Sequence, residues 1–328
     1  YGEVNPDDFC GCVIYSDVEQ TGSITTDNEL VNKLFQNVLW GQKGNFLEIP
    51  TDCPQRDERM GWTGDAQAFS GTAAFNMDVY AFFKKYLYDL MQEQKERGGN
   101  VPVVVPAHDV TQNGACAWGD AATIIPWNMY VYYGDDSVLI QQYESKKGWV
   151  DFRKSSDEAA GDKRLWTNDF HFGDWLSLDV EDPTNNRFGG TDRTFLASAF
   201  YCFSARLVAK AARVLNKEED AVYYEQLADE VREAIQKEYF TSSGRLAIDT
   251  QTAHVVALYM DLVPEEYKER IAYNLRLKLK ESNYHLRTGF IGTPYLCRVL
   301  SEHGSNDIAY KLLTNTDYPS WLYQVIMG

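Results

Sequence analysis

From residue 27 onward, apolar side chains recur with the 3.6-residue period of an amphipathic helix, in one stretch after another. The first stretch follows Asp27, which we expect to cap it, and keeps Leu30, Leu34 and Val38 on one face. Nine further helical stretches are expected at about 66–97, 120–134, 136–154, 190–215, 218–239, 250–261, 264–281, 290–302 and 305–314. Strand-like patterns are rare after residue 30, and Val101 to Pro106 is the main candidate.

Neighbouring helical stretches pair off across short polar turns, such as Asn216-Lys217 and Val263-Pro264-Glu265. Long loops separate the pairs, at about 44–64, 98–119, 155–189 and 282–289. Long irregular connections in a compact domain are usually functional. About ten helices in sequential hairpins therefore predict an all-α toroid rather than a small bundle. The first 26 residues alternate loosely and are expected to form one or two strands.

Charge and cysteine usage argue against several classes of protein. The net charge is −17, whereas phosphate binding needs clustered Lys and Arg, so no nucleic-acid partner is expected. No run of about eighteen apolar residues occurs, so we predict no membrane span. The six cysteines lack metal-ligand spacing and are predicted to be free thiols, with no metal and no cofactor. The aromatic content of 14% fits a core, and it also suits a sugar site.

The densest polar cluster in the chain runs from Pro50 to Asp65 and holds four carboxylates, two arginines and Trp62. Pro54, Gly61 and Gly64 make a continuous helix unlikely here, so we expect a loop. Such a charge run usually means a solvated turn with surface ion pairs. A loop partly buried beside a tryptophan would keep these carboxylates only if they were paired or used. On spacing alone, the two interpretations have equal weight.

An aromatic residue with a Gly-Asp pair recurs three times, in Trp62-Thr63-Gly64-Asp65, Trp118-Gly119-Asp120 and Phe172-Gly173-Asp174-Trp175. Each aspartate could simply cap a helix, and for any one of them capping is as good an explanation as function. All three lie at the ends of long loops, however, and the inner helices of a toroid can point at one central funnel. We therefore predict a pocket walled by indoles and floored by carboxylates, which suits a sugar.

Glycoside hydrolysis typically uses two carboxyl groups, one of which must stay protonated near neutral pH. Neighbouring negative charges disfavour a further ionisation and so keep such a proton in place. Glu58 has Asp57 beside it and Asp52 and Asp65 close in sequence, while the flanking arginines act in the opposite direction. Glu58 is therefore the candidate general acid.

The run from Asp52 to Asp65 closely resembles the signature of bacterial α-L-rhamnosidases of glycoside hydrolase family 78. The segments 117–122, 173–176 and 288–295 are similar to that family as well, in the family's order. The resemblance implies an (α/α)6 barrel that removes terminal α-L-rhamnose by an inverting mechanism, with Glu58 as the general acid. It also implies rhamnose-binding residues at Asp52, Arg56, Asp57, Trp62 and Asp65, with Trp118 and Trp175 as aromatic walls.

At its C-terminal end this sequence differs from the family's pattern. In the family, a segment like Tyr318-Pro319-Ser320-Trp321 is followed shortly afterwards by the glutamate that acts as general base, and this sequence ends at Gly328. We therefore expect residues 27–328 to be a barrel catalytic domain that is incomplete at its C-terminus. Residues 1–26 are expected to be the tail of a preceding β-domain with its linker.

The partner implied by the resemblance is a rhamnoside substrate, and a homo-oligomer is compatible with the sequence. Two alternatives stay open. The chain could bind rhamnose-like sugars without hydrolysing them, or it could belong to another class of (α/α)6 glycosidase.

Overall fold

A computed structural model describes residues 5–107, 113–182 and 184–328 of the chain. Within these ranges the fold is almost entirely helical, with helices in more than half of the residues. The α-helices are α1 (Glu29–Asn45), α2 (Thr63–Asn76), α3 (Tyr80–Glu96), α4 (Ala121–Tyr133), α5 (Ser137–Ala159), α6 (Arg193–Val214), α7 (Glu218–Tyr239), α8 (Gln251–Tyr259), α9 (Lys268–Glu281), α10 (Thr293–Glu302), α11 (Asn306–Thr314) and α12 (Trp321–Met327). Two 3-10 turns, η1 (Pro6–Asp8) and η2 (Glu265–Tyr267), complete them.

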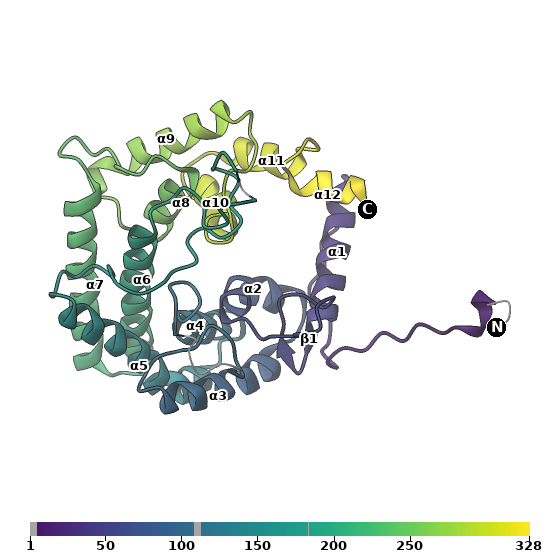
Figure 1. The fold of residues 1–328 in the computed structure, drawn as a ribbon, viewed down its shortest axis with the longest axis horizontal. Helices are drawn as coiled ribbons and strands as arrows, with labels where there is room; N and C mark the ends of the chain where they lie inside the picture. Colours follow the sequence, from purple (N-terminus) through teal and green to yellow (C-terminus); the bar gives the residue numbers. More distant parts are fainter. Residues whose placement is uncertain (1–4, 108–112, 183) are drawn as a thin grey trace.

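The helices form a ring of two layers (Figure 1). Helices α2, α4, α6, α8 and α10 lie inside and pack in that order, each against the next. Helices α1, α3, α5, α7, α9 and α11 lie outside. The outer helix α7 buries one stripe, from Ala221 through Tyr224, Leu227 and Val231 to Ile235, as the helical period predicts. The predicted toroid of helical hairpins is confirmed.

The inner helix α6 is apolar on nearly all sides. By length and composition it is the one helix of the described residues that could cross a membrane, but 83% of that stretch is buried inside the protein. A helix that is apolar all round can equally be the centre of a large core. We therefore assign α6 to the core of the ring.

Strand structure is smaller than predicted. In the described residues the sheet is a two-stranded antiparallel hairpin of β1 (Phe46–Leu47) and β2 (Ile49–Pro50). The strand predicted at Val101–Pro106 does not form. That segment is extended and buried, but it makes only an isolated bridge from Val104 to Trp62. A strand needs a partner along its length, and here the chain beyond Trp62 turns into helix α2.

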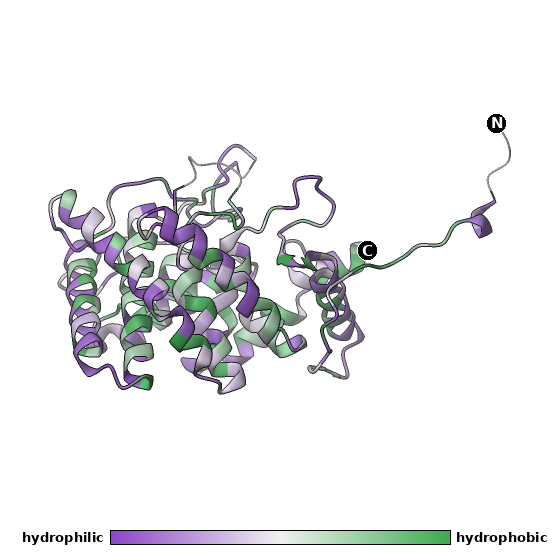
Figure 2. Cartoon of the chain, turned by 90° about the horizontal axis from the view of Figure 1, so that it is seen from below, coloured by the Kyte–Doolittle hydropathy of each residue, from purple (hydrophilic) through white to green (hydrophobic). Residues whose placement is uncertain are grey.

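The one or two strands predicted before residue 26 do not form in residues 5–26, and residues 1–4 lie outside the described part. The first part of this segment runs away from the ring (Figures 1 and 2), whereas its later part lies against it: Ser16 N donates to the Phe46 carbonyl and Gly22 N to the Asn76 carbonyl, each at 3.0 Å. Its one β-bridge joins Gln20 to Met77. Asp27 is not the cap of the first helix either. Asn28 caps α1, because its side chain accepts hydrogen bonds from the backbone N–H groups of Leu30 and Val31.

The helix predicted over 66–97 is two helices, because tertiary contacts break it at Met77. The Asn76 amide donates to Gln42 Oε1 at 2.9 Å. The Tyr133 hydroxyl accepts from Val79 N at 2.9 Å and donates to the Met77 carbonyl at 3.2 Å. The two bonds of Tyr133 satisfy backbone groups that a continuous helix would satisfy itself. Helix α12 was not predicted, and residues 108–112 of the predicted loop 98–119 lie outside the described part.

The ring is open at one place. Helix α10 packs on α8 and α11, and α1 packs on α12, but α2 and α10 are not packed against one another in this way. Between them the described residues place only α12 and the segment that precedes it. The inner ring therefore leaves a gap between its first and last helices, and a cavity lies there.

Candidate active site

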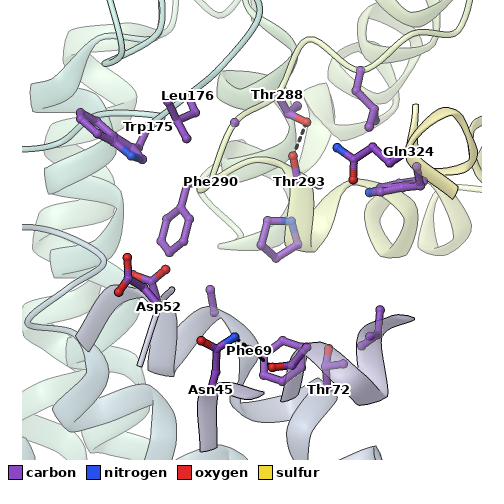
Figure 3. Close-up of a pocket in the computed structure, with 18 of the residues that line it drawn as sticks. Asn45, Asp52, Phe69, Thr72, Trp175, Leu176, Thr288, Phe290, Thr293 and Gln324 are labelled. Atoms are coloured by element: carbon purple, nitrogen blue, oxygen red, sulfur yellow. Dashed lines mark hydrogen bonds between the residues drawn. The ribbon is translucent and has the colours of Figure 1, made fainter. Parts of the chain in front are cut away.

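A cavity of about 950 Å³ lies at the opening of the ring. Helices α1 and α2 and the segment 50–52 form one wall. The segments 175–178 and 286–290, the start of α10 and residues 318–324 form the other. Figure 3 shows Asp52, Asn45 and Phe69 on the first wall, facing Trp175 and Phe290 on the second. Segments more than 100 positions apart in the sequence thus meet across one concavity.

The polar loop between β2 and α2 places Asp52 at this cavity and connects two further predicted residues, Arg56 and Glu58, to it. Arg56 Nη1 lies 3.4 Å from an Asp52 oxygen and 3.3 Å from a Glu58 oxygen. The Asp52 side chain is mostly buried, at 13% exposure, while that of Glu58 is 34% exposed. Arg56 therefore joins the candidate acid to a carboxylate that lines the cavity.

Asp65 lies in the first turn of α2 and lines the cavity with Asp52. Burial raises the pKa of the Asp65 carboxyl to about 7, with a smaller contribution from the negative charge of Asp52. Near neutral pH this carboxyl therefore exchanges between a hydrogen-bond donor and an acceptor. A hydroxyl group of a sugar can pair with either form.

The predicted tryptophans belong to one aromatic cluster centred on Phe172, the aromatic residue of the third Gly-Asp motif. The Phe172 ring lies 4.4 Å from Trp118, 5.9 Å from Trp175 and 6.1 Å from Trp62, between ring centroids. Trp118 also stacks on Phe290 at 5.1 Å. Trp175 and Phe290 line the cavity, and Trp62 and Trp118 lie behind them.

Three buried polar atoms around this site have no hydrogen-bond partner within the described part of the chain: Asp52 Oδ1, Trp62 Nε1 and Trp118 Nε1. Buried polar groups in proteins are normally paired, so unpaired ones mark places where a ligand or water is expected. One acceptor and two donors suit a ligand rich in hydroxyl groups. In the described residues no cluster of His, Cys, Asp or Glu could hold a metal ion.

Residues 19–328 match the family model described as the bacterial alpha-L-rhamnosidase 6 hairpin glycosidase domain. The chain belongs to this family. Among its relatives is an "Alpha-L-rhamnosidase" of Formosa agariphila, 43% identical over 322 residues, with 97% of this chain and 34% of the relative covered. Another, of Alteromonas sp. (strain LOR), is 40% identical, with 96% and 34% covered. The chain thus spans about a third of the length of these curated relatives.

Solved rhamnosidases share the fold of this rhamnosidase-family domain. An α-L-rhamnosidase from Aspergillus terreus matches with a TM-score of 0.90 and 38% identity, over 95% of this chain and 36% of that one. The Streptomyces avermitilis enzyme "complexed with L-rhamnose" matches with a TM-score of 0.87 and 38% identity, over 96% and 29%. The (α/α)6 architecture is confirmed by these matches.

The predicted site residues of this rhamnosidase-family domain do not all lie at the cavity. Asp52, Asp65 and Trp175 line the cavity, Arg56 is ion-paired with both Asp52 and Glu58, and Trp62 and Trp118 lie in the aromatic cluster behind. Asp57 is exposed on the loop and has no hydrogen bond or ion pair among the described residues. The structure therefore does not bring Asp57 to the cavity.

The predicted floor of three aspartates is wrong for two of them. Asp120 is fully buried and accepts hydrogen bonds from Ala117 N at 2.7 Å, Trp149 Nε1 at 2.8 Å and Ser204 Oγ at 2.6 Å. Asp174 is fully buried as well and accepts from backbone N–H groups of the segment 289–292. Both side chains point into the protein, because donors from distant segments surround them. Of the three, only Asp65 lines the cavity.

Several cavity residues were missed by sequence reasoning, among them Asn45, Phe69, Thr72 and Gln324. These four lie on helices α1, α2 and α12, where the sequence does not distinguish a residue that faces a cavity from one that faces the core or solvent. Thr288, Phe290 and Thr293 belong to the segment 288–295, which was noted only for its resemblance to the family. The spacing of residues along the chain does not distinguish a side chain that lines the cavity from one that does not.

Proposed function

We propose that this chain is the catalytic domain of an α-L-rhamnosidase that removes terminal α-L-rhamnose with inversion at the anomeric carbon. The supporting observation is the cavity at the ring opening, with Asp52 and Asp65 on one wall, Trp175 on the other, and Glu58 joined to Asp52 through Arg56. Carboxylates accept hydrogen bonds from hydroxyl groups, and an indole packs against the C–H face of a sugar ring. A neutral ligand rich in hydroxyl groups fits this composition.

In the proposed mechanism Glu58 donates its proton to the glycosidic oxygen as the bond from that oxygen to C1 breaks. A water molecule attacks C1 from the opposite face and loses its proton to a general base. We assign rhamnose binding to Asp52, Arg56, Trp62 and Asp65, with Trp118 and Trp175 as aromatic walls. Asp57 joins this set only if its loop closes on the sugar.

We propose further that the general base lies outside residues 1–328. The base of an inverting enzyme activates water on the face of the sugar opposite the acid. The two described carboxyl groups that line the cavity, Asp52 and Asp65, lie on the same wall as the loop that carries Glu58. Among the described residues, the lining of the opposite wall includes no Asp or Glu.

The binding half of the proposal is tested by calorimetric titration of the chain with L-rhamnose and with its mirror image, D-rhamnose. We expect binding of L-rhamnose and a much weaker response to D-rhamnose, because a chiral cavity distinguishes the two. Equal binding of both sugars, or of neither, would contradict the proposal.

The catalytic half is tested with aryl α-L-rhamnosides in the presence of azide, a small nucleophile that attacks C1 without a base. Azide should accelerate release of the aryl group by this chain, and equal rates with and without azide would place the base inside it.

Glu58→Gln should lower kcat/KM by about 10²–10⁴-fold for a poor leaving group, and far less for dinitrophenolate, which leaves unprotonated. A uniform loss for both leaving groups would contradict the role of Glu58 as the acid. Sugar binding without turnover would favour the alternative of a binding protein.

A further inference from the structure

Asp174 is a buried carboxylate in an unusual position. Its side chain is fully buried, and no Lys or Arg lies within ion-pair distance of it in the part of the chain that the structure describes. A buried charge without a counter-charge is costly unless hydrogen bonds to its oxygens offset the loss of water. The hydrogen bonds that offset this cost therefore decide what Asp174 does in the fold.

Four donors surround this carboxylate, and they come from two other parts of the ring. Ile291 N and Gly292 N donate to Oδ1 at 2.8 and 3.1 Å. Gly289 N donates to Oδ2 at 2.7 Å, and the Thr252 hydroxyl donates to the same oxygen. Each carboxylate oxygen thus accepts two hydrogen bonds, so both oxygens are fully hydrogen-bonded. We call Asp174 and these four donors the junction.

The junction fixes two cavity-lining segments to each other. Trp175 directly follows Asp174, and Phe290 lies between two of the donating residues, Gly289 and Ile291. Phe290 N also donates to the Trp175 carbonyl at 2.8 Å. Trp175 and Phe290 both line the cavity, on the wall that faces Asp52 (Figure 3).

Close packing reinforces the junction. A Cβ atom added at Gly289 would lie 2.5 Å from the Trp175 carbonyl oxygen and 2.6 Å from that of Asp174. The two segments therefore approach as closely as their backbones allow. They cannot shift past each other without breaking the hydrogen bonds to Asp174.

We propose that Asp174 is a positioning residue, which holds Trp175 and Phe290 at the separation that the sugar requires. It does not touch the sugar itself. The proposal rests on the proposed function for its sugar, but the placement of Trp175 can be measured without any ligand. An asparagine cannot replace this aspartate, because its amide N–H₂ would face a donor on one side.

The test compares Asp174→Asn and Thr252→Val with Thr252→Ser. Thr252→Val removes one donor while keeping the shape of the side chain. It therefore still tests the proposal if Asp174→Asn does not fold. The matched control is Asp157→Asn, another buried carboxylate that accepts two backbone N–H groups, from Lys163 and Arg164, at 3.0 Å each and does not line the cavity. This variant disturbs a buried set of backbone hydrogen bonds, together with an ion pair to Arg164 Nη1 at 3.5 Å, at a place that does not line the cavity.

We expect Thr252→Val to weaken L-rhamnose binding about tenfold and Asp174→Asn about 100-fold, since a displacement of about 1 Å in a site can cost about 10²-fold. Thr252→Ser should restore binding, and Asp157→Asn should lower the melting temperature without changing the affinity. Unchanged affinity in Thr252→Val and in folded Asp174→Asn, or the same loss in Asp157→Asn, would overturn the proposal.

A second measurement separates this proposal from the proposed function. With 5-fluorotryptophan incorporated and the Trp175 signal assigned by Trp175→Phe, fluorine NMR reports on Trp175 without ligand. We expect that signal to shift or broaden in Thr252→Val, while the signal of exposed Trp40 stays unchanged. If the wild-type chain binds no L-rhamnose, the proposed function fails, and the Trp175 signal still decides whether Asp174 positions this residue.

Discussion

At the scale of single residues, four candidate carboxyl groups lie in three kinds of environment. Glu58 is partly exposed beside Arg56, and Asp65 faces the cavity. Asp120 and Asp174 are buried among donors. Burial raises the pKa of each of the last three, to about 7 for Asp65 and about 6 for Asp120. The surroundings of each group therefore decide its chemistry.

Asp65 makes stability depend on pH. Its folded-state pKa of about 7 lies above the ordinary value of 3.8, so the folded state holds a proton that the unfolded state releases. Stability from this group is fully present at low pH and is lost as the pH rises from about 4 to 7. Asp65→Asn should therefore stabilise the chain at pH 8 by on the order of 2–4 kcal/mol, and not at pH 4. Urea unfolding at the two pH values measures this, and an equal effect at both would contradict it.

Arg56 should matter for function and little for stability. Its side chain is 54% exposed, and ion pairs at such sites contribute less than about 1 kcal/mol. Arg56→Gln should leave the melting temperature almost unchanged and lower the affinity for L-rhamnose at least about tenfold, because Asp52 and Glu58 lose their common partner. Arg298→Gln, which breaks the exposed pair with Glu302, is the control and should change neither quantity. A loss of stability without a loss of affinity would show that Arg56 has a structural role only.

At the scale of elements, helix α2 contains two glycines that differ in the space available for a side chain. A Cβ atom at Gly64 would lie 2.6 Å from the Trp118 ring, whereas one at Gly71 would meet the Tyr132 hydroxyl at 3.5 Å, an ordinary contact. Gly64→Ala should destabilise the chain by about 1–3 kcal/mol and weaken sugar binding, because the ring must move. Gly71→Ala should stabilise it by about 0.5–1 kcal/mol. Thermal unfolding of both variants measures this, and equal effects would contradict it.

The contact between α4 and α5 includes a buried lysine. Lys146 is fully buried and donates to the Thr123 carbonyl at 2.8 Å, and burial lowers its pKa to about 7. The unfolded state binds a proton that the folded state lacks between about pH 7 and 10.5, so this group makes stability rise with pH over that range.

Lys146→Met should remove that rise and stabilise the chain at pH 7 by on the order of 2–4 kcal/mol. Lys147→Met, which breaks the partly exposed pair with Asp220, is the control and should change stability by less than about 1 kcal/mol. Denaturant unfolding between pH 6 and 10 gives both values. A parallel pH profile for Lys146→Met and the wild type would show that Lys146 is charged in the folded chain.

At the scale of the whole molecule, the cavity lies where the ring is open, between helices from the two ends of the domain. A ligand that contacts both walls links segments that are otherwise not packed together, and binding to the folded state stabilises it by mass action. L-rhamnose should therefore slow backbone hydrogen exchange in 42–52 and in 286–293 together, and leave α7 unchanged. Protection of one wall alone would contradict a site between the two.

The sequence by itself determined the helical class, the hairpins and the polar loop from Asp52 to Asp65. These features depend on residues within a few turns of each other, so periodicity, prolines and glycines report them directly. The resemblance to rhamnosidases came from the same local run of residues. The helical ring agrees with what was expected on that basis, and of the eight site residues that the resemblance implied, Asp52, Asp65 and Trp175 line the cavity.

Only the tertiary structure decided which aspartate faces the cavity, where the first long helix breaks, and which rings surround Trp118. Asp174 is paired with Gly292, 118 positions away, and Asp120 with Ser204, 84 positions away. Spacing along the chain cannot report such partners, because a helix cap, a buried junction and a ligand-binding carboxylate look identical locally. The physical difference between them is the set of donors that folding brings around each oxygen.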